Sequence, residues 1–307
     1  MRLFFIFTLI NIFVPRYAFA STCLVIDKAR KTLTVLKDKR PAVKVHVSLG
    51  IDPDSDKYKV NDAATPEGLY FITYKKPKSR FHRFLGISYP NLINAIRALM
   101  GGVISPEEYK KIYTAIKKSE AVPCDTGLGC GIGIHGGGIY RLFDGVPEAD
   151  WTEGCVALND KDIDQIFPLV RPNDTVIILN SRRNLYGVIR PFASIIETDK
   201  SGFPVCPVGV CTFETGLKTS MGRMLIEIKE GRDGNRSLKV MVFDENGKGP
   251  ENEPILVLTD QNADGRIGPG DTATGPLAQG KDPQAIYDLI RKVVIDALHK
   301  GDIIRHY

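Results

Sequence analysis

Apolar and polar residues alternate along the first part of the chain, which strongly restricts the fold that it can adopt. The apolar positions are Leu33, Val35, Val43, Val45, Val47 and Leu49. Successive side chains of a β-strand point to opposite faces, so a period of two predicts strands with one buried face. The segment 69–74, after the Thr65-Pro66 turn, and the run 176–179 have the same strand character. Residues 21–182 are therefore predicted to form a mainly β domain.

Residues 91–120 break this pattern. Their apolar side chains recur at helical spacing, at Leu92, Ile93, Ile96, Leu99 and Met100. Ser105 is suited to cap a second helix, with Pro106 at its first position and acidic residues in its first turn. We expect a helical hairpin inserted in the β domain, acting either as a packing element or as a lid over a binding groove.

The chain of 307 residues is long enough for a second domain. The polar segment 181–184 suits a boundary, so residues 183–307 are predicted to form an accessory domain. Strand-like runs at 224–228, 238–243 and 254–258 precede an amphipathic helix, which has Asp282 as its cap, Pro283 at its first position and Gly301 at its end. A small α+β domain is the expected result.

Residues 1–20 are typical of a secretory signal. Arg2 gives a positive start, an apolar segment follows, and Ala18-Phe19-Ala20 forms an A-x-A cleavage site. We therefore expect an exported protein without a transmembrane anchor, because this segment is short and no later one is apolar enough to span a membrane. The net charge of +5 is not gathered into a stripe, so no nucleic-acid partner is expected.

Export makes disulfides possible. The six cysteines are Cys23, Cys124, Cys130, Cys155, Cys206 and Cys211. Cys124 is close enough in sequence to Cys130 to be bridged, and Cys206 to Cys211, although spacing does not settle connectivity. A bridge between Cys124 and Cys130 would brace the loop that leads to His135.

Cys155 has the most specific chemical context in the chain. It follows Gly154 in a run of short residues, and a turn of this kind presents a thiol beside backbone N–H groups that can bind an oxyanion. His135, at the end of a predicted strand over 131–134, can take the thiol proton. A loop is expected over 136–150, and a short helix over 160–169. Metal binding by this pair is disfavoured, because no CxxC pair or third ligand is near.

These residues resemble the L,D-transpeptidase family with a YkuD-type catalytic domain. The resemblance rests on His135 followed by Thr152-Glu153-Gly154-Cys155, on Thr65-Pro66-Glu67-Gly68, and on the segment 79–91. It covers roughly residues 23–180, and the Trp151-Thr152-x-Gly154-Cys155 form is closer to a Gram-negative branch. It implies a β-sandwich or barrel in residues 21–182 and a periplasmic protein.

The same resemblance implies acyl transfer from peptidoglycan tetrapeptide stems without a cofactor. Cys155 would be the nucleophile and His135 the base, while Gly154 and Thr152 would form the oxyanion turn. An amine acceptor would give a cross-link, whereas water would give L,D-carboxypeptidase activity on stems or release of a wall-anchored protein.

Two positions depart from the family pattern. Glu153 stands where many members have His, and Ala157 stands where many have an Arg that holds a substrate carboxylate. We expect substrate binding from the residues His82, Arg80, Arg83, Gly136 and Gly137. The departures also leave open a calcium-dependent wall-binding protein with a degenerate catalytic domain.

Residues 260–271 match the twelve-residue calcium loop. The expected ligands are Asp260, Asn262, Asp264, the Arg266 carbonyl and Asp271. Gly265 makes the turn, and Asp271 replaces the usual Glu at the last position, which predicts weaker binding. The alternative is an acidic turn that binds nothing.

Overall fold

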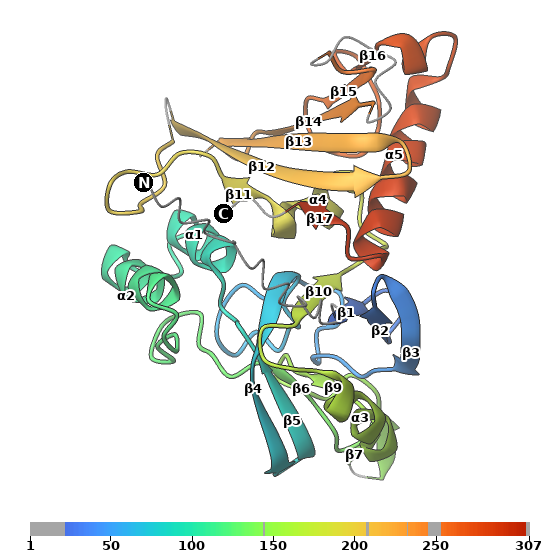
Figure 1. The fold of residues 1–307 in the computed structure, drawn as a ribbon. Helices are drawn as coiled ribbons and strands as arrows, with labels where there is room; N and C mark the ends of the chain where they lie inside the picture. The colour runs from blue at the N-terminus through green and yellow to red at the C-terminus, as the bar shows by residue number, and fades with distance from the viewer. Residues whose placement is uncertain (1–21, 144, 207–208, 232, 245–252, 305–307) are drawn as a thin grey trace, which may run out of the picture.

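A computed structural model describes residues 22–143, 145–206, 209–231, 233–244 and 253–304. The chain is mainly β, as predicted. Its two large sheets lie one above the other (Figure 1). The secretory signal expected at residues 1–20 lies outside the described residues. Among those that are described, no helix has both the length and the apolar character to cross a membrane.

The first sheet carries the candidate site. Its strands are β1 (Thr22–Asp27), β2 (Thr32–Lys37), β3 (Arg40–His46), β4 (Gly68–Ser79), β5 (His82–Ile87), β6 (Gly133–His135), β9 (Val156–Ala157) and β10 (Thr175–Leu179). They are ordered β3-β2-β1-β10-β4-β5-β6-β9. Isolated bridges join Ser48 to Ala157 and Gly50 to Thr152, so the segment after β3 meets β9 at the opposite edge. The sheet therefore curls back on itself around an apolar core. This agrees with the expected β-sandwich or barrel.

The helical insertion consists of α1 (Leu92–Met100) and α2 (Pro106–Lys117). Ser105 caps α2 in a reciprocal capping box with Glu108, as its sequence predicts. The Tyr109 hydroxyl donates to the Gly202 carbonyl at 2.6 Å, and the Tyr109 ring lies 5.0 Å from that of Phe203. Of the two roles considered, these contacts support a packing element between the sheets. Beside the first sheet lie α3 (Asp160–Ile166) and the 3-10 turn η1 (Phe167–Leu169), where a short helix was expected.

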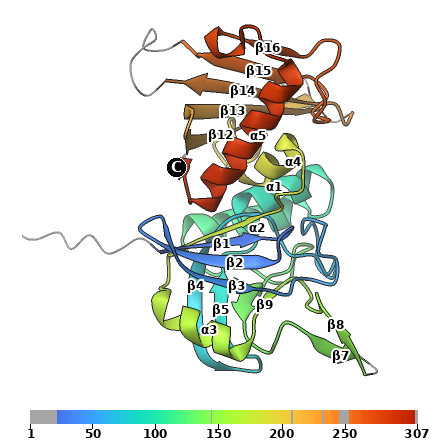
Figure 2. The same cartoon turned by 90° about the vertical axis from the view of Figure 1, so that its right-hand side faces the viewer.

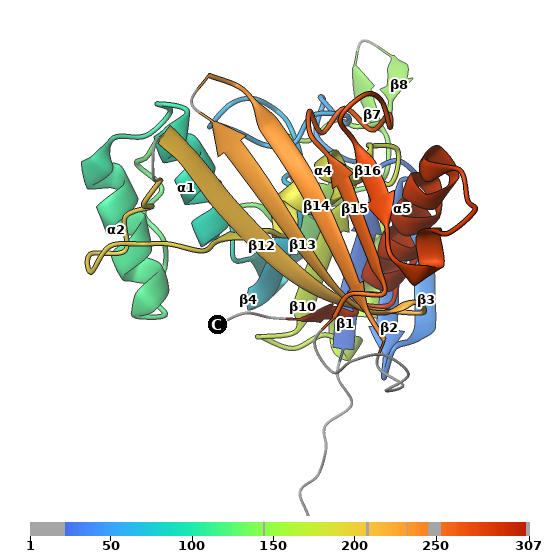
Figure 3. The same ribbon diagram turned by 90° about the horizontal axis from the view of Figure 1, so that it is seen from above.

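The second sheet forms the α+β part of the chain. Its strands are β11 (Ser194–Ile195), β12 (Val210–Thr219), β13 (Gly222–Gly231), β14 (Arg236–Phe243), β15 (Leu256–Asp260), β16 (Thr272–Thr274) and β17 (Ile303–Ile304). Its helical segments are α4 (Leu185–Ile189), η2 (Arg190–Phe192), η4 (Pro276–Ala278) and α5 (Pro283–His299). Helix α5 lies across one face of the sheet and begins at the predicted cap, since Asp282 accepts from the Ala285 N–H (Figure 2). Seen from above, β12 to β15 run side by side between α2 and α5 (Figure 3).

The two sheets share one apolar core. Val25 and Ile177 of the first sheet belong to the same buried cluster as Phe213 of the second sheet and Ile290 of α5. A boundary between residues 182 and 183 remains a prediction, because this cluster is continuous across it.

Both expected disulfides form, between Cys124 and Cys130 and between Cys206 and Cys211. The first bridge ends one residue before Gly131, at the entrance to β6. It therefore braces the segment that delivers His135.

The prediction of a loop over 136–150 is wrong in part. Strands β7 (Arg141–Phe143) and β8 (Val146–Glu148) pair as a hairpin that projects away from the second sheet (Figure 2). The two residues between them are Asp144-Gly145, and Asp-Gly between short strands is a strong hairpin signal. Arg141 is the first residue of β7 and lies at the open end of the hairpin, opposite Glu148.

Candidate active site

Strand pairing brings Cys155 and His135 together. β6 and β9 are parallel neighbours, with His135 opposite Ala157. Side chains alternate along a strand, so Cys155, two residues before Ala157, continues the face on which His135 lies. The thiol is half-buried, and its sulfur lies 3.9 Å from the Gly131 carbonyl oxygen.

The turn before Cys155 is held by its own side chains and by backbone contact. The Thr152 hydroxyl donates to the Cys155 carbonyl at 2.7 Å and accepts from the Gly154 N–H at 3.2 Å. Gly154 has a φ of +124°, and a Cβ there would lie 2.6 Å from the Ala64 carbonyl oxygen, so only glycine fits. The Gly154 N–H is thus already engaged. The Cys155 N–H has no hydrogen-bond acceptor among the described residues and is left as a donor.

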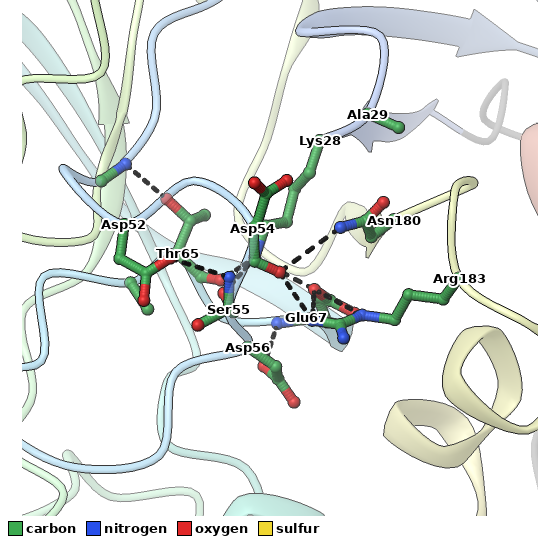
Figure 4. A network of polar contacts seen from close by, with 12 residues as sticks. Lys28, Ala29, Asp52, Asp54, Ser55, Asp56, Thr65, Glu67, Asn180 and Arg183 are labelled. Carbon is green, nitrogen blue, oxygen red and sulfur yellow. Dashed lines mark hydrogen bonds and ion pairs between the residues drawn. The ribbon is translucent and has the colours of Figure 1, made fainter.

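The Thr65-Pro66-Glu67-Gly68 motif is linked to this turn by hydrogen bonds through Gly50. The Thr65 hydroxyl accepts from the Gly50 N–H at 2.9 Å, and Gly50 bridges to Thr152. The Lys28 ammonium donates to the Thr65 carbonyl at 2.8 Å and to Glu67 at 3.0 Å. Arg183 reaches the same carboxylate from the start of the second part of the chain (Figure 4). A buried ionic network therefore links the motif, the turn and the region near the expected domain boundary.

His135 is only 1% exposed, and its ring is held by a hydrogen bond and by three aromatic neighbours. Its Nδ1 lies 2.6 Å from the Gly136 carbonyl oxygen, an acceptor, so Nδ1 carries the proton and Nε2 is left as the base. Its ring stacks on Phe81 at 4.4 Å and on Phe84 at 5.8 Å, and meets the edge of Trp151 at 5.8 Å. The carbonyl that orients the His135 ring thus belongs to the next residue in the chain.

Burial shifts both groups toward their neutral forms. Desolvation raises the pKa of Cys155, against the opposing effects of the Gly133 backbone and the Lys57 charge. Desolvation lowers the pKa of His135, and the nearby Arg141 charge lowers it further, although the hydrogen bond with Gly136 opposes this. The pair therefore rests at neutral pH as thiol and imidazole rather than as an ion pair.

Residues 21–178 match the family described as the YkuD L,D-transpeptidase catalytic domain. The chain belongs to the L,D-transpeptidase family. No curated protein matches the chain. Similar solved structures include the L,D-transpeptidase from Mycobacterium smegmatis, 14% identical, with a TM-score of 0.29 over 52% of this chain and 58% of that one.

The Yku-type L,D-transpeptidase from Stackebrandtia nassauensis is 15% identical, with a TM-score of 0.30 over 53% of this chain and 57% of that one. Bd1075 of Bdellovibrio bacteriovorus is 14% identical, with a TM-score of 0.33 over 75% of this chain and 90% of that one. The chain thus spans somewhat more than half the length of the first two structures.

The substrate-binding residues expected for this L,D-transpeptidase domain are mostly engaged elsewhere. His82 lies 2.8 Å from Asp164 of α3, and Arg83 makes an ion pair with the same carboxylate. The Arg80 guanidinium lies over the Phe81 ring at 4.9 Å. Asp164 is distant in the sequence from His82 and Arg83, so the spacing of the basic residues gave no signal for it.

The two glycines after His135 pack closely against neighbouring segments and donate hydrogen bonds to them. The Gly136 N–H donates to the Arg83 carbonyl at 3.2 Å, and the Gly137 N–H donates to Asp160 at 2.7 Å. A Cβ at Gly136 would lie 2.5 Å from the Asp160 carboxylate. Both glycines therefore permit close packing behind His135 rather than offering free donors.

Arg141 is the site residue that sequence reasoning missed. Its guanidinium lies over the Trp151 ring at 4.3 Å and 5.7 Å from the centre of the Phe81 ring, so it borders the aromatic groups around His135. Its Nε is buried and has no hydrogen-bond partner among the described residues. By contrast, Ala157, where many family members have Arg, is fully buried. The Asp144-Gly145 signal predicts the hairpin that begins at Arg141, but not the position of this side chain over Trp151.

The predicted calcium ligands lie on the connection between β15 and β16. Asp260 is fully buried, and one of its oxygens accepts from the Gly265 N–H at 3.1 Å. Burial and the charges of Asp271 and Asp264 raise the pKa of Asp260, although two backbone N–H groups oppose this. No group of three His, Cys, Asp or Glu in metal-holding geometry occurs in the described part of the chain.

Proposed function

We propose that the protein is an exported L,D-transpeptidase that cross-links peptidoglycan by cysteine acyl transfer. Family membership supports the reaction class. The observation that carries the proposal is the Gly154-Cys155 turn, with its unpaired N–H, on the same face of the sheet as His135. The predicted signal at residues 1–20 supports a periplasmic location.

The first step forms a thioester. His135 Nε2 takes the Cys155 proton as the sulfur attacks the carbonyl between the diamino acid and the terminal D-residue of a tetrapeptide stem. The C–N bond then breaks, and the imidazolium returns the proton to the departing amine. Because both groups rest neutral, the proton moves when the substrate arrives, and no standing thiolate is needed.

The second step releases the enzyme. An amine from a neighbouring stem attacks the thioester while His135 accepts its proton, and the Cys155 sulfur leaves as a thiol. The Cys155 N–H stabilises the oxyanion in both steps, a contribution of roughly 3 kcal/mol for one donor. The Gly154 N–H, which donates to Thr152, instead fixes the shape of the turn.

Arg141 is our candidate for holding a stem carboxylate. A guanidinium with a buried, unpaired Nε beside the catalytic aromatic groups favours an anionic partner. Arg83 is already paired with Asp164, and Ala157 offers no charge. Arg141 would thereby supply the positive charge that many family members have at the position of Ala157.

The test is incubation of the purified protein with a disaccharide-tetrapeptide, with products identified by mass spectrometry. A dimer that has lost one terminal residue supports transpeptidation. Cys155→Ala should give no product, whereas Cys23→Ser, which changes the other cysteine outside the disulfides, should retain activity. A monomeric tripeptide as the only product would instead establish an L,D-carboxypeptidase. No product and no adduct on Cys155 would contradict both enzyme functions and favour the wall-binding protein.

A further inference from the structure

The connection between β15 and β16 has one unsatisfied group at its centre. Asp260 is the last residue of β15, and it is fully buried. One carboxylate oxygen accepts from the Gly265 N–H, and the other has no hydrogen-bond partner among the described residues. A buried carboxylate oxygen without a donor is costly, so this position favours a positive partner.

The rest of the loop carries further oxygen atoms, which its own hydrogen bonds hold in place. The Asn262 and Asp264 side chains lie within 2.9 Å of each other, and the Asp264 carboxylate also accepts from the Arg266 N–H at 2.7 Å. Asp271 accepts from the Gln261 and Gly268 N–H groups at 2.7 and 2.8 Å, which fixes it at the end of the loop. An ionised carboxylate has about four lone-pair sites, so these bonds leave room for metal coordination.

The backbone has the turn that such a site needs. Gly265 has a φ of +86°, and a Cβ there would lie 2.9 Å from the Asn184 side chain and 3.1 Å from the Tyr287 hydroxyl. The Ile267 N–H donates to the Gln284 side chain of α5 at 2.8 Å. Only three of the ligands expected from the sequence are carboxylates, and the others are an amide oxygen and a carbonyl.

We propose that residues 260–271 bind one calcium ion, with the unpaired oxygen of Asp260 as its buried ligand. Asn262, Asp264, the Arg266 carbonyl and Asp271 complete the protein ligands, and water supplies the remainder of the six to eight oxygens that calcium takes. Hard oxygen donors at the positions of a twelve-residue loop suit calcium better than magnesium, which demands a small octahedral site.

The position of the loop assigns the ion a structural role. Asn184, the cap of α4, donates to the Ala263 carbonyl at 3.2 Å, and the Tyr287 hydroxyl of α5 accepts from the Leu185 N–H at 2.9 Å. Arg291 of α5 donates to the Arg183 and Ser181 carbonyls at 2.7 and 2.6 Å. Calcium in this loop would therefore stabilise the contacts of the loop and α5 with residues 181–185, which connect the two large sheets.

The test uses the whole purified protein after removal of divalent ions. Titration with CaCl2 by calorimetry should show one site, with a Kd of about 10⁻³ M or tighter. At about a hundredfold excess over Kd, the Tm should rise by roughly 5 °C relative to protein in EGTA. Equal concentrations of MgCl2 should have little effect, and an equal shift with Mg²⁺ would overturn the calcium assignment.

Matched variants separate binding from folding. Asp260→Asn keeps the shape of the side chain and should abolish the calcium-dependent shift in Tm, whereas Asp296→Asn, on the exposed side of α5, should retain it. Asp264→Asn, at an exposed loop position, gives the same test if the buried variant folds poorly. No heat and no shift in the unmodified protein at millimolar calcium, or an undiminished shift in Asp260→Asn and Asp264→Asn, would overturn the proposal.

Discussion

The turn that carries Cys155 and the loop between β15 and β16 are both short segments at strand ends, and each has one polar group without a partner among the described residues. At Cys155 the unpaired group is a backbone N–H, a donor, and the nearby Arg141 Nε is a second one. At Asp260 it is a carboxylate oxygen, an acceptor. Unpaired donors fit the ligands that we propose for the first segment, a developing oxyanion and a carboxylate. An unpaired acceptor fits the cation that we propose for the second.

The two segments also differ in what holds them. The Cys155 turn is supported by residues distant in the sequence, such as Gly50, Ala64 and Thr65. The Asp260 loop is held mainly by its own side chains, with Gln284 as an outside contact. The shape of the turn is therefore set by the surrounding fold, whereas in our proposal the loop gains its last partner from the ion.

The largest expected effect is the loss of the base beside the turn. His135→Gln should slow acylation of Cys155 about 10²- to 10⁴-fold, because the thiol then has no group to take its proton. Single-turnover mass spectrometry measures this rate. His46→Gln, at an exposed position of β3, is the control and should be unchanged. A loss smaller than about tenfold at His135 would mean that another group accepts the proton.

Breaking the buried ion pair between Lys28 and Glu67 should lower the free energy of unfolding whether or not calcium is present. Glu67→Gln leaves the buried Lys28 ammonium without its counter-charge and should lower the free energy of unfolding by about 3–5 kcal/mol. Denaturant unfolding measures this, with Glu227→Gln as a surface control that should cost less than about 1 kcal/mol. Equal losses in the two variants would show that the network does not stabilise the turn.

Removing the second unpaired donor should weaken donor-stem binding. Arg141→Gln should raise the KM for the tetrapeptide about 10- to 100-fold, as expected for a hydrogen bond to a charged group. Arg223→Gln, which also removes an arginine over an aromatic ring but in the second sheet, should not. With a tetrapeptide whose bound carboxylate is amidated, the unmodified protein and Arg141→Gln should have the same KM. If Arg80→Gln raises the KM instead, Arg80 is the binding residue.

The smallest effect concerns pH. His135 must be neutral to accept a proton, and its pKa lies below the ordinary 6.5, so activity should fall only as pH drops below that value. Arg141→Gln removes a positive charge that lowers this pKa, so the acid limb should move upward. Acylation rates measured across pH, with the His135 imidazole followed by NMR, report both. An acid limb above pH 6.5 in the unmodified protein would contradict the assignment.

Much of the fold was predictable because it depends on local pattern. Period-two alternation identified β2 and β4, the Ser105-Pro106 start identified α2, and the Asp282-Pro283 start identified α5. Both disulfides join the two pairs of cysteines that are close in sequence, although spacing alone left their connectivity open. The hairpin β7–β8 was missed, although Asp144-Gly145 signals it, because its strands are only three residues each.

The site was predictable only where its chemistry is local. The context of Cys155 and His135 singles them out, and the spacing of oxygen-bearing residues over 260–271 is what suggested the proposed calcium site. The pairing of Arg83 with Asp164 and the position of Arg141 over Trp151 depend on strands that meet through the fold. The role of Glu67 likewise appears only when Lys28 and Arg183 converge on it.

The most direct test of the central claim is the intact mass of the protein during reaction with a tetrapeptide donor. The account predicts a covalent adduct equal to the stem without its terminal residue, located on Cys155 by peptide mapping and absent from Cys155→Ala. An adduct that persists in Cys155→Ala, or a product formed without any adduct at low pH, where thioesters survive, would contradict it.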